Sequence, residues 1–266
     1  MFSAQDVIRD LENIRRRAPL VHNITNFVVM NLTANALLSI GASPVMAHAV
    51  EEVEEMVGLA SALVINIGTL SRHWVEAMAR AVRAAEKKKI PVVLDPVGAG
   101  ATSFRTTTAR HLLESGPVSI IRGNGSEILA LVDAGTRTKG VDSLEKPEAA
   151  VEAGRQLSRQ YGCAVSISGP TDIVVREGQT IRVENGHPLM PRVTGLGCTA
   201  SALTGAFAAV NPDTLEAAAG AMAIMGICGE LAAEQARGPA SFELHFLDWL
   251  HHIGPQEIND RLRVKT

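Results

Sequence analysis

Residues 194–210 decide the fold of this chain, and they read Thr-Gly-Leu-Gly-Cys-Thr-Ala-Ser-Ala-Leu-Thr-Gly-Ala-Phe-Ala-Ala-Val. Gly195 and Gly197 form a turn that leads directly into a run of small residues typical of a helix. Such a turn leaves backbone N–H groups unpaired at the positive end of the helix, where a phosphate or an oxyanion binds well. Cys198 lies at the entrance, where the helix field favours a thiolate over a thiol. An anion site beside a group that accepts or positions a proton indicates phosphoryl transfer to a small alcohol.

Two other interpretations of this stretch compete with a phosphate site. A glycine pair before a helix is often a plain tight turn. The spacing of Gly195, Gly197 and Ala200 also fits the G-x-G-x-x-A fingerprint of dinucleotide-binding proteins. That fingerprint follows the first strand of a βαβ unit, with an acidic residue about 20 positions later. Here the turn lies in the last third of the chain, and Glu216 falls where a helix is expected to begin, so the context disfavours a dehydrogenase.

Length and composition indicate one large α/β domain over residues 1–266. Hydrophobic residues make up 46% of the 266, which suffices for a large core. A net charge of −3 gives no sign of a nucleic-acid partner. The three cysteines include no C-x-x-C pair, so neither a disulfide framework nor a zinc site is indicated. The N-terminal stretch lacks a signal-peptide hydrophobic region, and the longest apolar run, Ala217 to Gly229, is too short to span a membrane. We therefore expect a cytoplasmic protein with no membrane partner.

Apolar strands alternate with helices along the chain. A strand that is apolar along its whole length is typical of a parallel sheet covered by helices on both faces. We therefore expect a three-layer α/β/α fold with a central, mostly parallel sheet and antiparallel strands near its end. The expected strands are 20–24, 43–47, 63–68, 91–95, 118–122, 164–168, 173–176 and 180–184, and the expected helices are 3–17, 27–40, 71–89 and 147–161, with others starting at 198, 214 and 241.

Polar residues stand where several of these strands end. Asn66, Asp95, Arg122 and Ser168 occupy such positions. Each alone is most simply a residue that caps a neighbouring loop. Because ligands of open parallel sheets bind beyond the carboxyl ends of the strands, the four residues and the glycine turn together indicate one shared site.

Asp95 and Glu127 are the candidate ligands of a magnesium ion. Asp95 follows a buried strand, and Glu127 lies at the start of the next helix. Mg²⁺ usually keeps several waters, so two carboxylates suffice. An N-cap at Asn124, with Glu127 in the first helical turn, explains the same residues structurally, and the two roles are compatible. Arg122 ends an apolar strand, where its charge requires a partner such as a phosphate. The chain contains no P-loop motif.

Five further segments are informative in combination, although each alone is a weak signal. They are Val-His-Asn-Ile-Thr-Asn (21–26), Ala-Ser-Pro-Val-Met (42–46), Asn-Ile-Gly-Thr-Leu (66–70), Asp-Pro-Val-Gly-Ala-Gly (95–100) and Gly-Leu-Gly-Cys (195–198). With these segments the chain closely resembles the hydroxyethylthiazole kinase family of the ribokinase-like superfamily. The resemblance runs nearly end to end.

The resemblance implies ATP-dependent phosphorylation of the hydroxyl of 4-methyl-5-(2-hydroxyethyl)thiazole, a step of thiamine salvage. It also implies Mg²⁺ near Asp95 and Glu127, and a homotrimer with its active sites at the subunit interfaces. Nucleotide contacts are implied for Arg122, Ser168, Thr194 and Gly197, and contacts to the thiazole for Met46, Gly195, Asn26 and Gly68.

The position of Cys198 departs from the wider superfamily. Most ribokinase-like sugar kinases carry an aspartate as general base at the end of this glycine turn, whereas the thiazole kinases, like this chain, carry cysteine. A thiolate accepts the alcohol proton, or the cysteine chiefly positions the hydroxyl. Because the proton leaves late in a loose transition state, a strong base is not required.

Three alternatives share the fold or the ligand. A nucleotide-dependent dehydratase that repairs hydrated nicotinamide cofactors needs its own acid at the glycine turn, and cysteine there speaks against it. A non-catalytic nucleotide-binding sensor is disfavoured because Asp95, Glu127 and Cys198 are all present. Kinases of the thiamine pyrimidine branch have the same fold, but the segment 23–26 favours the thiazole.

Overall fold

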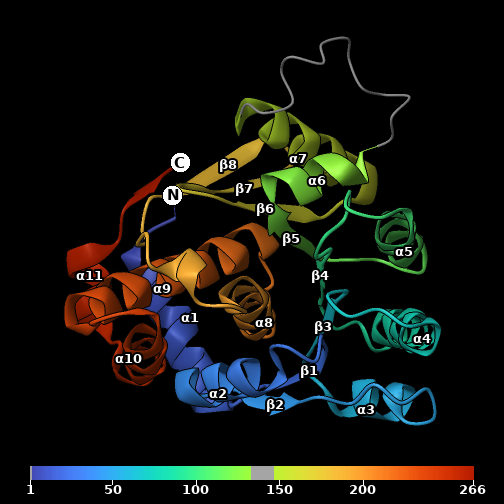
Figure 1. The fold of residues 1–266 in the computed structure, drawn as a ribbon, viewed down its shortest axis with the longest axis horizontal. Coiled ribbons are helices and arrows are strands. Elements are labelled where there is room, and N and C mark those ends of the chain that lie inside the picture. Colours follow the sequence, from blue (N-terminus) through green and yellow to red (C-terminus); the bar gives the residue numbers. More distant parts are fainter. Residues whose placement is uncertain (1, 133–146) are drawn as a thin grey trace.

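A nine-stranded sheet runs through the computed structural model, which describes residues 2–132 and 147–266 (Figure 1). Its strands are β1 (Leu20–Ile24), β2 (Ser43–Val45), β3 (Ala62–Asn66), β4 (Val92–Asp95), β5 (Ile120–Asn124), β6 (Ala164–Ser168), β7 (Asp172–Arg176), β8 (Gln179–Val183) and β9 (Val264–Lys265). In space they follow the order β2-β1-β3-β4-β5-β6-β7-β8-β9. Strands β1 to β6 pair in parallel, whereas β7, β8 and β9 are added antiparallel. The predicted mostly parallel sheet with antiparallel strands near its end is confirmed.

Helices cover both faces of this sheet (Figure 1). One layer holds α1 (Ala4–Arg17), α2 (Met30–Ile40), α8 (Leu196–Ala208), α9 (Thr214–Gln235), α10 (Pro239–His252) and α11 (Pro255–Arg261). The other layer holds α3 (Val53–Leu59), α4 (Arg72–Lys88), α5 (Ser103–Glu114), α6 (Gly125–Leu131) and α7 (Pro147–Tyr161). The predicted three-layer α/β/α fold is confirmed.

The apolar strands bury side chains on both faces because successive residues of a strand point to opposite sides. Val64 belongs to the core under α8 and α9, while its neighbours Leu63 and Ile65 belong to the core under α4. Two separate hydrophobic cores result, one on each face of the sheet.

Small residues let α8 and α9 pack closely. A Cβ atom at Gly205 of α8 would lie 2.5 Å from Val64 of β3, so only glycine fits at this contact. Helix α9 is long and apolar enough to cross a membrane by composition, but 89% of its most apolar window is buried inside the fold. The prediction of a buried helix over 217–229 is confirmed.

The structure differs from the predicted elements in a few places. Helix α2 begins at Met30 rather than at Phe27, because the side-chain oxygen of Asn26 accepts the N–H of Val28 and holds residues 27–29 in a turn. Strand β8 is not an edge strand, since β9 pairs with it. Helices α3, α5 and α11 and strand β9 were not predicted.

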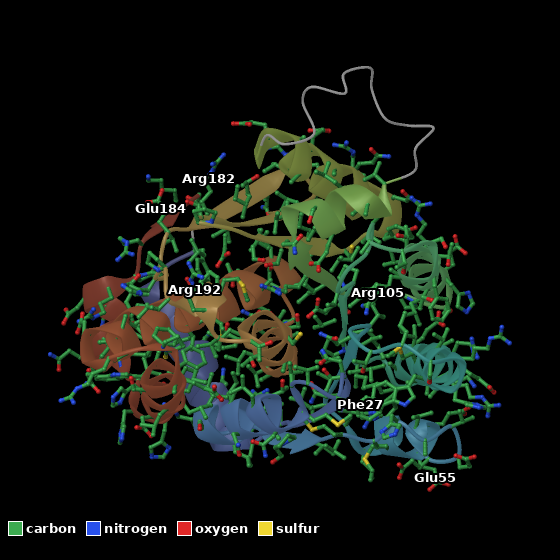
Figure 2. The ribbon with its side chains drawn as sticks, in the orientation of Figure 1. Phe27, Glu55, Arg105, Arg182, Glu184 and Arg192 are labelled. Atoms are coloured by element: carbon green, nitrogen blue, oxygen red, sulfur yellow. The ribbon has the colours of Figure 1, made fainter. Side chains whose placement is uncertain are left out.

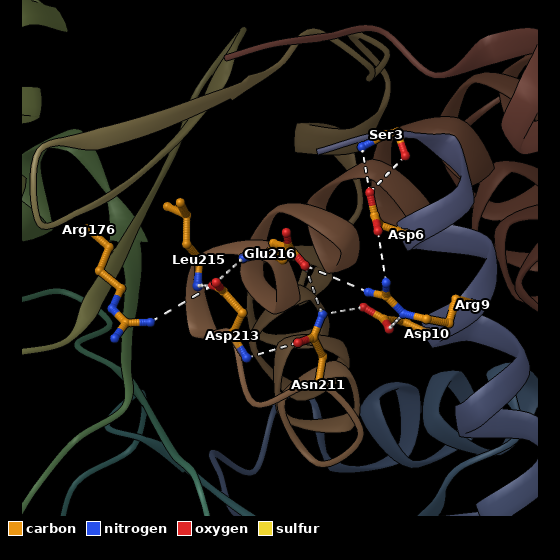
Figure 3. Close-up of polar contacts among 9 residues, drawn as sticks. All are labelled: Ser3, Asp6, Arg9, Asp10, Arg176, Asn211, Asp213, Leu215 and Glu216. Carbon is orange, nitrogen blue, oxygen red and sulfur yellow. Dashed lines mark hydrogen bonds and ion pairs between the residues drawn. The ribbon is translucent and has the colours of Figure 1, made fainter. Parts of the chain in front are cut away.

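A buried polar network ties α1 to the turn between α8 and α9 (Figure 3). Asp10 is 1% exposed, and it accepts from Nδ2 of Asn211 at 2.7 Å and from Nε of Arg9 at 3.1 Å. The side-chain oxygen of Asn211 accepts the N–H of Asp213, whose own carboxylate caps α9. The network therefore fixes the start of α9, and with it the helix layer behind the site.

Candidate active site

The polar residues at the strand ends meet at one edge of the sheet. Asn66 and Asp95 are register partners at the ends of β3 and β4, and Asn124 and Ser168 are register partners at the ends of β5 and β6. The glycine turn lies at this edge too, since Ser201 of α8 donates to Asp95. The prediction that Arg122 ends its strand is wrong, because β5 continues for two more residues to Asn124. That these positions form one site stays a prediction.

A chain of side-chain hydrogen bonds runs across the edge. Nδ2 of Asn26 lies 3.4 Å from Sγ of Cys198 and donates to Oδ1 of Asn66 at 2.9 Å. Nδ2 of Asn66 then donates to Oδ2 of Asp95 at 2.8 Å, and the hydroxyl of Ser201 donates to the same oxygen at 2.7 Å. Four elements of the fold thereby fix the thiol and the carboxylate relative to each other.

Asp95 is an unusual carboxyl group in this setting. It is 1% exposed, and burial raises its pKa to about 7, with the nearby charge of Glu127 adding to the effect. The guanidinium of Arg122 and the two hydrogen bonds to Oδ2 act in the opposite direction. Within the described residues Oδ1 accepts no hydrogen bond, so one oxygen stays available to a ligand.

Glu127 closes a capping box at the start of α6. Its Oε2 accepts the N–H of Asn124 at 2.8 Å, and Oδ1 of Asn124 accepts the N–H of Glu127 at 3.0 Å. Its Oε1 accepts the N–H of Gly98 at 2.9 Å, which joins the loop after β4 to α6. The predicted capping role of Asn124 and Glu127 is confirmed, and each carboxylate oxygen retains a second lone pair.

A cavity of about 960 Å³ opens beside the glycine turn. Its lining is mostly apolar with a few polar groups, which is typical of small-molecule sites. The residues predicted for the site that line it are Arg122, Ser168 and Gly197. Other lining residues were missed by the sequence reasoning: Asp172, Asn185, Met190, Met222, Met225 and Gly226.

Arg122 has the environment of an anion-binding residue. Arg122 is only 8% exposed, and its Nε atom has no hydrogen-bond partner among the described residues. A Cβ atom at Gly197 would lie 3.1 Å from Nη1 of Arg122, so the guanidinium faces the first turn of α8. No side chain caps that turn, so its free N–H groups and the guanidinium together form a positive surface suited to an anion.

The missed residues of the cavity gave only a weak signal in the sequence. The Ala, Gly and Met run of α9 predicts a buried helix and nothing about a ligand. Position 226 requires glycine, because a Cβ atom there would lie 2.6 Å from the carbonyl oxygen of Asn185. The sequence alone does not reveal this contact. Two hydrogen bonds fix the side chain of Asn185, since its Nδ2 donates to Oε1 of Glu230 at 3.1 Å and to the carbonyl oxygen of Arg261 at 2.8 Å.

Asn26, Gly68 and Gly195, three of the four residues predicted to contact the second substrate, lie close to Cys198. A Cβ atom at Gly68 would lie 2.6 Å from Nδ2 of Asn26, so these two residues are in direct contact. Gly195 adopts φ 87° as the N-cap of α8, and a Cβ atom there would lie 2.7 Å from Val29. Met46 is half-buried and directly follows β2.

Thr194 is exposed in the turn before α8 and does not line the cavity. The predicted nucleotide contact at this position is the one that the geometry of the cavity does not support.

A profile of the hydroxyethylthiazole kinase family matches residues 11–256. The chain belongs to the hydroxyethylthiazole kinase family. The hydroxyethylthiazole kinase of Syntrophus aciditrophicus is 62% identical over 252 residues, covering 94% of this chain and 93% of its own. The hydroxyethylthiazole kinase of Nitratidesulfovibrio vulgaris is 53% identical, covering 99% of each chain. The solved hydroxyethylthiazole kinase structure from Pyrococcus horikoshii superposes with a TM-score of 0.90 at 46% identity, covering 98% of each chain.

A more distant structure supports the fold of this hydroxyethylthiazole kinase family member. A ribokinase-like superfamily protein from Enterococcus faecalis superposes with a TM-score of 0.66 at 13% identity, covering 95% of each chain. The expected membership of the family and the ribokinase-like fold are both confirmed.

The thiol of Cys198 contradicts one expectation for this family member. The helix field was expected to favour a thiolate, but burial raises the pKa of the Cys198 thiol to about 11, and the charge of Asp95 acts in the same direction. The hydrogen bond from Asn26 only partly opposes this. Removal from water disfavours the thiolate, so the neutral thiol is the favoured form at pH 7.

Proposed function

We propose that this chain transfers the γ-phosphoryl group of ATP to the hydroxyl of 4-methyl-5-(2-hydroxyethyl)thiazole, a step of thiamine salvage in the cytoplasm. The observation that carries the proposal is the hydrogen-bonded chain from Cys198 through Asn26 and Asn66 to Asp95, beside a cavity lined by Arg122. Phosphoryl transfer depends on in-line positioning and on neutralised phosphate charge more than on covalent chemistry. The hydrogen-bonded chain positions the residues that face the alcohol, which we call the acceptor side of the site. The anion site beside it neutralises the phosphate charge.

The nucleotide occupies the cavity in this proposal. Arg122 and the free N–H groups of the first turn of α8 neutralise the phosphates, and Ser168 and Gly197 contact them. The apolar lining, with Met222 and Met225, packs against the base. In this proposal Thr194 does not contact the nucleotide. It belongs to the turn that leads into α8.

The alcohol lies on the other side of the glycine turn, between Asn26, Gly68, Gly195 and Met46. Cys198 holds its hydroxyl in line with the γ-phosphate. Because the Cys198 thiol is neutral and the proton leaves late, positioning supplies more of the rate than proton abstraction.

The residues present fit a magnesium ion. The described residues contain no cluster of three His, Cys, Asp or Glu side chains. Mg²⁺, however, is usually bound through one or two carboxylates and its own waters. Asp95 offers a free Oδ1, and its repulsion from Glu127 is relieved by a cation. Asp95 and Glu127 would hold the ion, which would neutralise charge on the phosphates.

We also propose that residues 1–266 form a single kinase domain that assembles as a homotrimer with active sites at the interfaces. Phe27 and Val28 directly follow Asn26 and are each 65% exposed, which is unusual for large apolar side chains (Figure 2). Phe27 packs on the buried Trp74, with ring centroids 4.8 Å apart, and its outer face remains exposed. Sedimentation equilibrium gives the mass of the assembly, and Phe27→Asp is expected to yield monomers with reduced activity; a monomeric, active wild type would contradict the trimer.

ADP release from Mg-ATP tests the reaction. The thiazole alcohol is compared with the pyrimidine alcohol of thiamine biosynthesis and with no acceptor. Release only with the thiazole supports the proposal. Nucleotide binding without turnover on any acceptor would indicate a sensor, and conversion of a hydrated nicotinamide cofactor would indicate a dehydratase.

A further inference from the structure

Arg105 of α5 binds three main-chain carbonyl groups at the carboxyl edge of the sheet (Figure 2). Its Nη1 donates to the carbonyl oxygen of Ile67 at 2.9 Å and to that of Val97 at 2.7 Å. Its Nη2 donates to the carbonyl oxygen of Gly68 at 2.7 Å. Ile67 and Gly68 lie in the loop after β3, and Val97 lies in the loop after β4. One guanidinium therefore joins the two loops that follow the paired strands β3 and β4.

Each of these loops carries one half of the proposed site. Gly68 is in contact with Asn26, and its N–H donates to Oδ1 of Asn66 at 2.9 Å, so the first loop supports the acceptor side. Gly98 follows Val97, and its N–H donates to Oε1 of Glu127 at 2.9 Å, so the second loop supports the carboxylate side. Together with the hydrogen bonds among Asn26, Asn66 and Asp95, the junction of these loops sets the separation of the two halves.

The contact suits arginine and no other side chain. The planar guanidinium presents its N–H groups in a fixed fork, whereas a lysine ammonium is a point charge on a flexible stem. Hydrogen bonds from a charged donor are about twice as strong as neutral ones. Gly98 has φ +73°, and a Cβ atom there would lie 3.1 Å from Cδ of Arg105, so the loop closes tightly around the side chain. Arg105 forms no ion pair within the described residues, so the carbonyl groups are its partners.

We propose that Arg105 is a positioning residue that holds the acceptor side and the carboxylate side of the site at a fixed separation. This inference rests on the proposed phosphoryl transfer. In-line transfer is sensitive to alignment, and a shift of about 1 Å can cost about 10²-fold in rate. Loss of the guanidinium hydrogen bonds of Arg105 loosens the alignment of the alcohol with the phosphate and lowers kcat, while the cavity that binds the nucleotide is left intact.

Arg110 provides a matched control on the same helix. Its guanidinium donates to the carbonyl oxygens of Ala130, Leu131 and Val132 at 3.1 to 3.3 Å, at the end of α6. Both arginines thus bind three carbonyl groups from α5, but only Arg105 joins the loops of the site. A loss of overall stability affects substitutions of both arginines, whereas a loss of alignment in the site affects only substitutions of Arg105.

The experiment compares Arg105→Lys with Arg110→Lys in kcat, in KM for each substrate, and in Tm. For Arg105→Lys we expect kcat to fall roughly 10- to 100-fold with KM for ATP within about twofold. Arg110→Lys is expected to keep the wild-type kcat despite its own loss in Tm. An unchanged kcat in Arg105→Lys, or equal losses of kcat in both variants, overturns the inference.

Two further readouts keep the inference testable where activity is not informative. Guanidinium ion at millimolar concentration is expected to restore part of kcat in Arg105→Ala and none in Arg110→Ala. Amide exchange at Gly68 and Gly98 is expected to be faster in Arg105→Lys and unchanged in Arg110→Lys, and this holds even without turnover. If wild type phosphorylates no thiazole, the proposed function fails; if exchange at these glycines is unchanged in Arg105→Lys, the positioning role fails.

Discussion

The amide nitrogen Nδ2 of Asn26 lies 3.4 Å from Sγ of Cys198, and this contact joins the loop after β1 to the first turn of α8. The sulfur accepts from the amide, so the thiol is held in one orientation on the acceptor side of the site. Since burial raises the pKa of Cys198 to about 11, the contact orients a neutral group in the free protein. Positioning of the alcohol, rather than prior ionisation, is the role that this geometry favours.

Replacing Cys198 by Ala is expected to lower turnover about 10²-fold, in line with the contribution of a single proton-handling group. Nucleotide binding should be retained, because Arg122 and the free N–H groups of α8 are untouched. Steady-state kinetics and calorimetric titration of the nucleotide check the two parts. Unchanged turnover would remove Cys198 from catalysis.

Cys198→Asp distinguishes proton acceptance from positioning. An aspartate here reproduces the base found at this turn in the related sugar kinases. Retained or raised activity in this variant supports proton acceptance at position 198. Activity as low as that of Cys198→Ala shows that the shape and hydrogen bonding of the thiol matter more than basicity.

Removal of the divalent cation with a chelator is expected to abolish turnover. Asp95→Asn is expected to raise the Mg²⁺ concentration needed for half-maximal activity by at least ~10-fold. Asparagine keeps an acceptor for Ser201 but loses the charge. Ser201→Ala, assayed above about pH 8, is the control, because it removes one hydrogen bond to Asp95 and keeps the ionisable carboxyl group. An Mg²⁺ activation curve shared by Asp95→Asn and Ser201→Ala would argue against a metal role for Asp95.

Gly226→Ala is expected to weaken nucleotide binding, with KM for ATP raised about 10-fold, because overpacking costs about 1–3 kcal/mol. A Cβ atom at this position would lie 2.5 Å from Cβ of Asn185 and 2.6 Å from its carbonyl oxygen, so the cavity wall has to move. Gly58→Ala in α3 is the control, since nothing lies within 4 Å of its Cβ position. KM for ATP should be unaffected there, and an equally unaffected Gly226→Ala would place the nucleotide elsewhere.

The pH dependence of stability is expected to reveal Asp172, whose pKa burial raises from 3.8 to about 6. The protonated carboxyl favours folding, so this contribution is complete below pH 3.8 and is lost as the pH rises through about 6. Asp172→Asn does not titrate but still accepts the N–H of Gly169. Its free energy of unfolding relative to wild type should therefore rise by about 1 kcal/mol between about pH 5 and pH 8. Urea unfolding at both pH values measures this, with the exposed Asp260→Asn as control; a difference that is independent of pH would refute the assignment.

The positions of most strands were predictable because burial on both faces leaves a continuous apolar run, as in β3 and β4. Their order in the sheet was not predicted. The positions of Asp95 and Glu127 were predictable too, since a carboxylate directly after such a strand and another at the start of the next helix both fall at the carboxyl edge of a parallel sheet. Helices α3 and α5 were not predicted: α3 has only 7 residues, and α5 begins with a polar stretch and carries no long apolar stripe.

The remainder of the site depends on contacts between distant parts of the chain. Met222 and Met225 line the cavity only because Gly226 lets α9 approach Asn185. Arg105 acts through carbonyl groups, which every residue carries, so its partners leave no trace in the sequence. The ionisation of Cys198 was predicted wrongly because the helix position is local, whereas burial at that position comes from the assembled fold.

The hydrogen bond between Asp10 and Asn211 spans 201 positions of the chain, and this sets a constraint on biosynthesis. The carboxylate of the first helix emerges early from the ribosome, while its partner in the buried network follows only after most of the protein has been made. At about 5–20 residues per second, the nascent chain waits roughly 10–40 s with α1 unable to dock. Until then the face of α1 that packs against α8, α9 and α11 has no partner, so this helix docks late in folding.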